Sequence, residues 1–521
     1  QIAKFEELGI NYAVDNEYME SNYLARMEWM RFILTFFNAD EQVNEVMNNA
    51  QKVLRNTNPL DIIIYKVNYQ DYKEGCEILR AVKHFCPDRK VYLLGYFAEM
   101  NCAALGKKYD FIDGIIFHDG CYFIQKYLES NGGELCGGMF KKEPQNSFFY
   151  NDQVKNIPLS ELPFPARDIE KLEKHSYINI TKSVGCYGKC SFCHINLIHR
   201  NFSTRSVQSV VDEMCFCQKE LGKKMFIFND SAFWFSHKDD SMIDEFVDLL
   251  KKKKLRINFM IYLKCTPFIG KKRLQKLKEV GLCRVFIGIE NISNRFLDEY
   301  HKKVLDYYEI LMAFQELKIS YHIGFILFHP HVTIPELREN IEFLFRLKKL
   351  FRIGIIVEKM RMLPRNNKDT SFSSNNEVDK AYDYNFDNQE VSMAFDLLCS
   401  FYKCIDVRNF ENVCTSTLFL INLYQNEYGD ENAAVFNLFI NEVNEFNQYA
   451  YQFYCRLFNL VEEKASYSQI WSVIEKNQPD FIRYYYNFES LRGLVYDYIG
   501  HIDEDLCKMV FHGQRRLNID E

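Results

Sequence analysis

The chain has 521 residues, of which 47% are apolar and 16% aromatic, and its formal net charge is −7. This length exceeds what one hydrophobic core usually organises, so we expect two or three globular domains and exclude a disordered or fibrous protein. The negative balance offers no basic face for a polyanion, which argues against a nucleic-acid substrate. Because the sequence shows no membrane-length apolar run, its first residues resemble neither a signal nor a transit peptide, and its cysteines are scattered, we expect a cytoplasmic protein with reduced thiols.

Residues 1–145 predict a doubly wound, Rossmann-like α/β domain. Short β-branched or aromatic runs alternate there with helix-length segments, as in a parallel sheet covered by helices. The predicted strands are 10–14, 61–65, 90–95 and 112–117, with one or two helices within 23–55. The chain opens in a helical stretch, whereas such a domain normally begins with a strand. We therefore expect a segment before residue 1 of the natural protein to supply the first strand.

A linker is predicted for residues 146–174, because the closely spaced prolines at 157–165 favour extended backbone. Residues 175–370 then predict a partial, TIM-like barrel of six βα units, whose ligands lie at the carboxyl ends of the strands. Its predicted strands are 177–180, 225–228, 257–262, 284–289, 321–327 and 353–357. Residues 371–521 are helical in pattern and rich in aromatic residues, and they predict a helical C-terminal domain.

Three cysteines, Cys186, Cys190 and Cys193, form a CxxxCxxC cluster in the loop after the first barrel strand. Iron–sulfur clusters are usually held by four cysteine thiolates, so three closely spaced ones predict a cluster with one iron open to a substrate or cofactor. Zinc binding and chance are the alternatives. Structural zinc sites prefer paired CxxC motifs, and no matching second pair occurs.

The cysteine loop, its place after the first strand and the six βα units together resemble the radical S-adenosylmethionine (SAM) enzymes. The resemblance implies that the three cysteines hold a [4Fe-4S] cluster whose open iron chelates SAM, which one electron cleaves to a 5′-deoxyadenosyl radical. It also implies SAM contacts at Phe192 in the loop and at Asp230, Glu290 and Gly324 near later strand ends. As an alternative, either acidic residue caps the helix that follows it.

The N-terminal domain resembles the cobalamin-binding domain often fused ahead of this barrel, through segments such as 58–64, 85–87 and 159–165. The resemblance implies cobalamin contacts at Tyr65, Gly95, Tyr96 and Gly114. Two features depart from the usual pattern. Tyr96 follows Gly95 where paired glycines are common, and no DxHxxG motif is present to supply a histidine ligand for cobalt.

Together these resemblances imply a cobalamin-dependent radical SAM enzyme that methylates an unactivated carbon of a small-molecule or peptide natural-product precursor. A flavodoxin or ferredoxin would supply the electron. One alternative is a radical rearrangement or cyclisation enzyme that uses or merely retains the cobalamin domain. A non-catalytic binding module is disfavoured by the intact cysteine loop, and an RNA-modifying enzyme by the charge balance. His329, at a strand end facing the predicted site, is a further residue to test.

Overall fold

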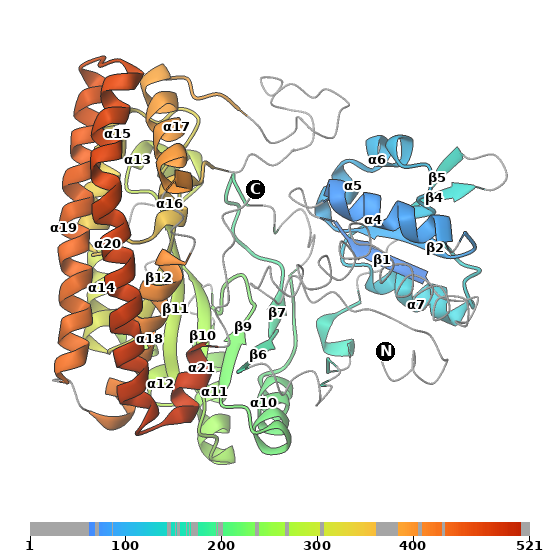
Figure 1. Cartoon of the computed structure of the whole chain (residues 1–521). Coiled ribbons are helices and arrows are strands. Elements are labelled where there is room, and N and C mark those ends of the chain that lie inside the picture. The colour runs from blue at the N-terminus through green and yellow to red at the C-terminus, as the bar shows by residue number, and fades with distance from the viewer. Residues whose placement is uncertain are drawn as a thin grey trace, which may run out of the picture.

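The computed structural model describes residues 62–67, 72–85, 87–142, 147–151, 153, 157–162, 164–165, 167, 176–193, 195, 202–234, 239–265, 270–302, 307–360, 384–404, 409–429 and 433–511. The strand predicted at 10–14 and the helices predicted within 23–55 lie outside this part. Figure 1 shows an N-terminal sheet with its helices, a central set of strands and helices, and long C-terminal helices. In the described part, no helix combines the length and the apolarity that crossing a bilayer requires.

The N-terminal sheet has the strand order β1-β2-β3-β4-β5, with β1 to β3 parallel and β4 and β5 antiparallel. Its elements are β1 (Ile62–Lys66), α4 (Tyr72–Phe85), β2 (Lys90–Leu94), α5 (Tyr96–Met100), α6 (Cys102–Lys108), β3 (Gly114–Ile116), α7 (Cys121–Glu129), β4 (Gly138–Lys142) and β5 (Ser147–Asn151). The strands predicted at 61–65, 90–95 and 112–117 are confirmed. The hairpin of β4 and β5 was not predicted, because β5 is mostly exposed and has no buried apolar run.

Helices cover both faces of this sheet, as the Rossmann-like prediction requires. On β2, Val91 and Leu93 point to one face, where they pack with residues of α4, α5 and α6, including Leu79 and Leu105. The intervening Tyr92 points to the other face and packs against α7. This alternation follows from the two-residue period of a strand.

The central unit is a parallel sheet of order β12-β11-β10-β9-β6, flanked by helices. Its elements are η1 (Leu159–Glu161), β6 (Tyr177–Ile180), β7 (Ser183–Val184), β8 (Ser203–Thr204), α10 (Val207–Leu221), β9 (Met225–Phe228), α11 (Asp240–Lys253), β10 (Asn258–Lys264), α12 (Lys271–Lys278), β11 (Leu282–Glu290), α13 (Asn294–Glu299), α14 (Tyr307–Glu316), β12 (Ser320–Phe325), α15 (Ile334–Arg346) and α16 (Ile353–Val357). Five of the six predicted barrel strands are thereby confirmed.

The sixth predicted strand, at 353–357, is wrong, because these residues form the short helix α16. Their β-branched sequence favours a strand, but the Gly354 N–H donates to the carboxylate of Glu411 at 3.0 Å, and the Arg352 guanidinium pairs with the same carboxylate. The backbone N–H of Gly354 is therefore hydrogen-bonded to a side chain of the C-terminal region and not to a neighbouring strand. Strand-like pairing remains as one parallel bridge between Phe328 and Lys359.

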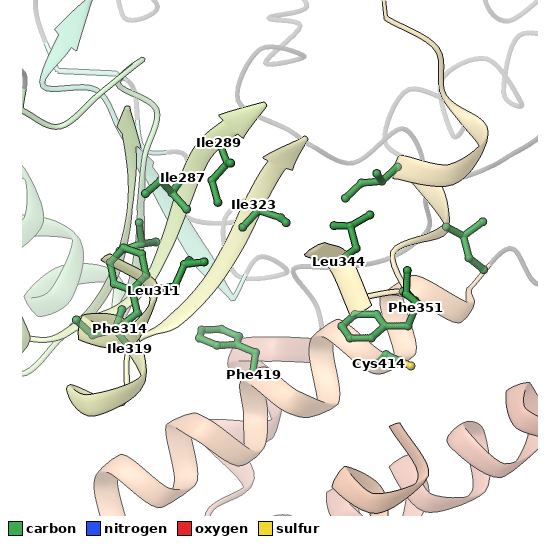
Figure 2. Packing of buried hydrophobic residues seen from close by; sticks show 14 of the residues in the cluster. Ile287, Ile289, Leu311, Phe314, Ile319, Ile323, Leu344, Phe351, Cys414 and Phe419 are labelled. Carbon is green, nitrogen blue, oxygen red and sulfur yellow. The ribbon is translucent and has the colours of Figure 1, made fainter. Parts of the chain in front are cut away.

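The C-terminal region is helical, as predicted, and it shares a hydrophobic core with the barrel. Its helices are α17 (Gln389–Cys404), α18 (Phe410–Tyr428), α19 (Ala434–Glu462), α20 (Tyr467–Gly500) and α21 (Glu504–Phe511). Ile287 of β11, Ile323 of β12 and Phe419 of α18 belong to one buried cluster. Figure 2 shows Phe419 on α18 together with Ile287 and Ile323 on the neighbouring strands. The helices thus cover apolar surface that the incomplete barrel would otherwise expose.

A buried ionic cluster fastens the segment before the barrel to α10. Arg167 and Arg205 both pair with Glu213, whose side chain is only 1% exposed. Arg167 also donates to the carbonyl oxygen of Asn179 at 3.0 Å, which ties it to β6. The Arg205 guanidinium lies 5.5 Å from the centre of the Phe164 ring. A buried carboxylate is stable here because two cations share it.

We predict that Glu213→Gln lowers the free energy of unfolding by about 3 kcal/mol, since it leaves two buried guanidinium groups without their counter-charge. Chemical denaturation of the full chain measures this change. Glu279→Gln is the matched control, because Glu279 pairs with Lys251 where both side chains are about half exposed, and such pairs contribute little. Equal effects of the two substitutions would contradict the prediction.

Candidate active site

A cavity of about 310 Å³ opens at the carboxyl ends of β9, β10 and β11. All three cysteines of the CxxxCxxC loop line it, and so do Asp230 after β9 and Glu290 at the end of β11. The cysteine loop follows β6 and β7, so the predicted placement after the first barrel strand is confirmed. The strand ends of a parallel barrel are where ligands bind. The remaining lining residues are Phe192, Ile195, Asn229, Ser231, Tyr262, Leu263, Lys264, Phe286, Gly288 and Lys302.

The three thiols form no disulfide and are partly buried. Burial raises the pKa of Cys186, whereas the N–H of Gly188, donating to Cys186 Sγ at 3.2 Å, and the cations Lys264 and Lys302 oppose that rise. Burial also raises the pKa of Cys193. The neighbouring N–H groups and cations favour thiolates, which are the form that binds metal.

This donor set fits a cubane cluster better than a single ion. Among the described residues, no group of three or more His, Cys, Asp or Glu side chains converges on one point as ligands of one ion would. The three cysteines instead surround the cavity. Each thiolate of a [4Fe-4S] cluster binds a different iron, so its ligands stand farther apart than those of zinc.

A turn after α13, Tyr300 to Lys302, holds the cysteine loop against the barrel. The Ser191 N–H donates to the Tyr300 carbonyl oxygen at 3.3 Å, and the His301 ring Nδ1 lies 3.0 Å from the carbonyl oxygen of Lys189. Lys302 Nζ donates in the other direction, to Gly288 O at 2.9 Å and to Glu290 Oε1 at 2.8 Å. Three consecutive residues therefore connect the loop to the end of β11.

Glu290 is held in a strained backbone position. Its φ of 71° is left-handed, which is uncommon outside glycine, and the β11–β12 register shifts between Gly288 and Glu290. A Cβ on Gly288 would lie 2.3 Å from Glu290 Oε1, so a side chain at this position would displace the carboxylate. The strain and the Lys302 pair aim the carboxylate at the cavity, and such strain is typical of functional sites.

Asp230 lines the cavity, but its oxygens already have protein partners. The Ser183 hydroxyl and the Lys182 N–H donate to its carboxylate, and Lys182 Nζ lies 3.6 Å away. Burial raises the pKa of Asp230, and Lys182 opposes that rise. Asp230 therefore fixes the start of the cysteine loop, a structural role that the sequence did not indicate. Its contact with SAM stays a prediction.

The two remaining SAM-binding predictions concern the cavity walls. Phe192 lines the cavity and packs edge-on against Tyr300, with ring centroids 5.2 Å apart. Gly324 lies on β12 behind the cavity, where a Cβ would be 3.0 Å from the Phe286 ring and 3.4 Å from Glu290 Oε2. Phe192 therefore lines the cavity and Gly324 adjoins two groups that line it, while the contacts of both residues with SAM stay predictions.

Lys264, at the carboxyl end of β10, is a site residue that the sequence analysis missed. Its Nζ and the Sγ atoms of Cys186 and Cys190 all lie within 3.8 Å of the point where a Cβ on Gly188 would stand. A cation therefore adjoins two of the three thiols. If the predicted strand 257–262 had been extended by two residues, it would have ended at Lys264, and ligands bind at the carboxyl ends of such strands.

The four predicted cobalamin residues do not lie together at one edge of the N-terminal sheet. Gly95 and Tyr96 follow β2 at the carboxyl edge, where ligands of doubly wound sheets bind, but Tyr96 is buried. Tyr65 packs its ring on Gly75 of α4. Gly114 begins β3 at the opposite edge, where a Cβ would meet Phe140 at 2.6 Å, so packing accounts for this glycine.

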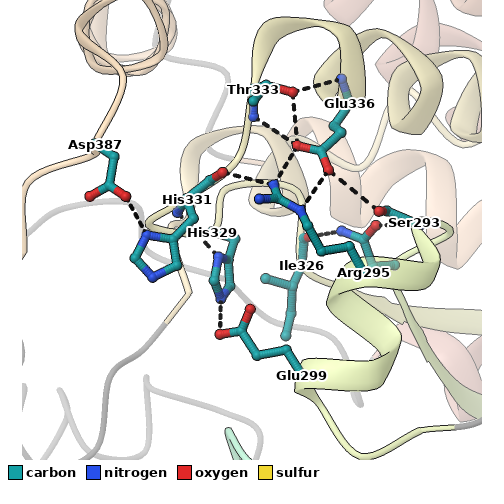
Figure 3. A network of polar contacts seen from close by, with 10 residues as sticks. Ser293, Arg295, Glu299, Ile326, His329, His331, Thr333, Glu336 and Asp387 are labelled. Carbon is teal, nitrogen blue, oxygen red and sulfur yellow. Dashed lines mark hydrogen bonds and ion pairs between the residues drawn. The ribbon is translucent and has the colours of Figure 1, made fainter. Parts of the chain in front are cut away.

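A network of histidines and carboxylates supports the same turn from outside (Figure 3). His329 is 1% exposed and packs on Phe296 and Tyr300 at 4.5 and 5.7 Å. The His331 N–H donates to His329 Nδ1 at 3.2 Å, so Nε2 of a neutral ring carries the hydrogen that faces Glu299 at 3.1 Å. Burial lowers the pKa of His329 to about 4, and His331 and Arg295 add to that effect.

We predict that His329 makes the protein acid-sensitive between about pH 6.5, the usual pKa in an unfolded chain, and pH 4. As the pH falls through this window, His329 becomes protonated in the unfolded chain but stays neutral in the folded protein. The free energy of unfolding therefore falls by up to about 3 kcal/mol. His329→Asn removes this component, which denaturation at pH 7 and pH 4.5 measures. His501→Asn, at an exposed position, is the control, and an unchanged pH dependence in His329→Asn would contradict the prediction.

Comparison with known proteins agrees with this geometry. Residues 180–344 match the model of the radical SAM superfamily. The curated ribosomal protein uS12 methylthiotransferase RimO of Treponema denticola is 23% identical over 330 residues, which cover 56% of this chain and 66% of that protein. RimO of a Hydrogenobaculum species is 23% identical over 37% of this chain and 40% of its own length. The matches thus span less than two thirds of either curated relative.

The fold has a counterpart among solved structures. The cobalamin-dependent SAM radical enzyme OxsB, in a structure with aqua-cobalamin and SAM bound, superposes with a TM-score of 0.61 at 16% identity. The superposition covers 90% of this chain and 76% of OxsB, so it includes the N-terminal sheet, the barrel and the C-terminal helices. Residues 180–344 therefore form a radical SAM domain, and the chain has the fold of the cobalamin-dependent SAM radical enzyme OxsB.

Proposed function

We propose that this enzyme uses a [4Fe-4S] cluster, SAM and cobalamin to methylate an unactivated carbon of a small-molecule or peptide substrate. The observation that carries the proposal is the cavity at the carboxyl ends of β9 to β11, where three cysteine thiols face an acidic strand end and a lysine. A flavodoxin or ferredoxin is the proposed electron source. When bound, the cluster supplies an electron to SAM, and cobalamin supplies the methyl group.

The residues present fit the cluster and SAM in distinct ways. Cys186, Cys190 and Cys193 would hold three irons. The pair of Glu290 and Lys302 presents one carboxylate and one ammonium group, and SAM carries an amino group and a carboxylate. Oppositely charged pairs of this kind orient a zwitterion by charge-assisted hydrogen bonds. Phe192, Tyr262 and Phe286 give the cavity apolar walls, which limit the access of solvent to a reactive intermediate.

The fit to cobalamin rests on the fold and on the carboxyl edge of the N-terminal sheet. Gly95 and Gly120, with φ values of 115° and 72°, follow β2 and β3 at that edge and offer backbone there. His118 also follows β3, but its side chain is 9% exposed and lies against Glu99. A corrin at this edge would therefore meet the backbone of Gly95 and Gly120.

The runner-up function keeps the same cofactors and ends in rearrangement or cyclisation of the substrate. The described site serves both outcomes, because the cysteine loop, Glu290 and Lys302 act before the substrate radical reacts. The product decides between the two. SAM labelled in its methyl carbon, supplied with cobalamin and a low-potential reductant under anaerobic conditions, should transfer label to the substrate. Substrate turnover with unlabelled product would establish the alternative. Absence of bound corrin would contradict the methyl-transfer proposal.

We predict that Cys190→Ala abolishes cluster assembly, since two thiolates cannot hold the cubane. Iron and sulfide content after anaerobic reconstitution should fall to background, and the charge-transfer absorbance of the cluster should disappear. Cys404→Ala is the matched control, because Cys404 is exposed on α17. A variant Cys190→Ala with full iron content would mean that the three thiols do not hold a cluster.

We predict that Lys264→Met makes the cluster harder to reduce, because it removes a cation that stabilises the extra negative charge of the reduced state. The midpoint potential, followed by electron paramagnetic resonance, should fall by tens of millivolts, and Lys264→Arg should restore most of it. Lys252→Met, on the exposed end of α11, serves as the control. An unchanged potential in Lys264→Met would show that its ammonium group does not act on the cluster.

A further inference from the structure

A second, much smaller cavity lies inside the barrel toward the amino ends of β11 and β12. Its volume is about 20 Å³, enough for one group of the size of a water molecule. Arg284 of β11, His322 of β12, Lys349, Arg352 and Thr415 of α18 line it. Arg284 and Phe286 are two residues apart on β11 and so point to the same side of the sheet. Phe286 lines the active-site cavity, which places the small cavity one layer deeper in the barrel.

An aromatic layer separates the two cavities. Tyr262, Phe286 and His322 are partners across β10, β11 and β12. The centre of the Phe286 ring lies 5.1 Å from that of Tyr262 and 5.4 Å from that of His322. Tyr262 and Phe286 belong to the active-site wall, whereas His322 belongs to the small cavity. The deeper cavity is therefore a separate site.

Positive charge exceeds negative charge around this cavity. Arg284 and Arg352 are 8% and 9% exposed, and Lys349 is partly buried. The carboxylate of Glu411 faces them but already accepts from Arg352 and from the Gly354 N–H. Burial lowers the pKa of Lys349 to about 7 and that of Arg284 to about 10, and the neighbouring cations add to both effects. Burial and the same cations also lower the pKa of His322, and this residue adds no negative charge.

Two hydrogen-bond donors at the cavity have no partner among the described residues. They are Arg284 Nε and Thr415 Oγ1, both buried. Lys349 Nζ faces aromatic rings, at 4.7 Å from the centre of Tyr321. Buried donors without acceptors are rare, because each costs the hydrogen bond that it made to water. An acceptor with negative charge would satisfy the donors and the excess charge together.

From this arrangement we infer that the cavity binds one small monovalent inorganic anion of the size of chloride, held by Arg284, Lys349 and Thr415. The cavity is too small for phosphate or for a substrate carboxylate. Since β11 and β12 supply one side of the site and α18 the other, the anion fastens the C-terminal helices to the incomplete barrel. The inference is independent of the proposed reaction.

The test compares thermal unfolding of the full, cluster-reconstituted chain in sodium chloride, sodium bromide and sodium gluconate at equal ionic strength. A ligand that binds the folded state raises the midpoint, so chloride and bromide should raise it saturably by about 2–4 °C over gluconate. Thr415→Val keeps the shape of the side chain and removes the donor, and it should lose most of this shift. No halide-specific shift in the unmodified chain would overturn the inference.

Thr417→Val is the matched control. Thr417 lies on the same helix, is fully buried, and its Oγ1 likewise has no described partner, but it does not line the cavity. The control should keep the full halide shift, and equal losses in both variants would overturn the inference. Anomalous diffraction from a crystal grown in bromide gives a direct readout. A bromide peak beside Arg284 Nε and Thr415 Oγ1 is expected, whereas a water molecule there would contradict the proposal.

Discussion

The site depends on one short turn. Tyr300, His301 and Lys302 link two segments that are about a hundred residues apart, the cysteine loop and the end of β11, through a backbone carbonyl, an imidazole and an ammonium group. The loop itself has little regular structure, so its thiols keep their places only where other elements hold the chain. Because Lys302 also satisfies Glu290, the same turn sets the position of both the proposed iron ligands and the carboxylate opposite them.

Buried charges organise the barrel at several levels, and each has a partner that fixes its direction. Asp230 holds the start of the cysteine loop through Lys182 and Ser183. Glu290 is fixed by Lys302. Glu213 joins the preceding segment to α10. A buried pair contributes little net stability compared with apolar packing, but removing one member is costly. These pairs therefore specify where loops attach more than they stabilise the fold.

The sequence predicted the parts that depend on local pattern. The spacing of Cys186, Cys190 and Cys193 and the five apolar strand runs needed no knowledge of distant contacts. Glu290 and Asp230 were named because their strand ends resemble those of the radical SAM enzymes, and both line the cavity. Lys302 was missed because its role comes from a turn that returns to β11. The prediction of the sixth strand was wrong for a related reason. Local propensity favours a strand at 353–357, but the contact of this segment with Glu411, far along the chain, favours a helix.

The missing sixth strand changes what the C-terminal helices have to do. A closed barrel satisfies its last strand by pairing it with the first, whereas here the segment after β12 makes one parallel bridge, between Phe328 and Lys359. An open sheet edge needs cover, and α16 with α18 lies in that position through Arg352, Glu411 and the apolar contacts of Phe419. Arg352 can stay buried inside the barrel because the same helix brings the carboxylate of Glu411 to it. The helical region is therefore part of the barrel wall, and changes in α18 will alter the packing of the layer of rings directly beneath the active-site cavity.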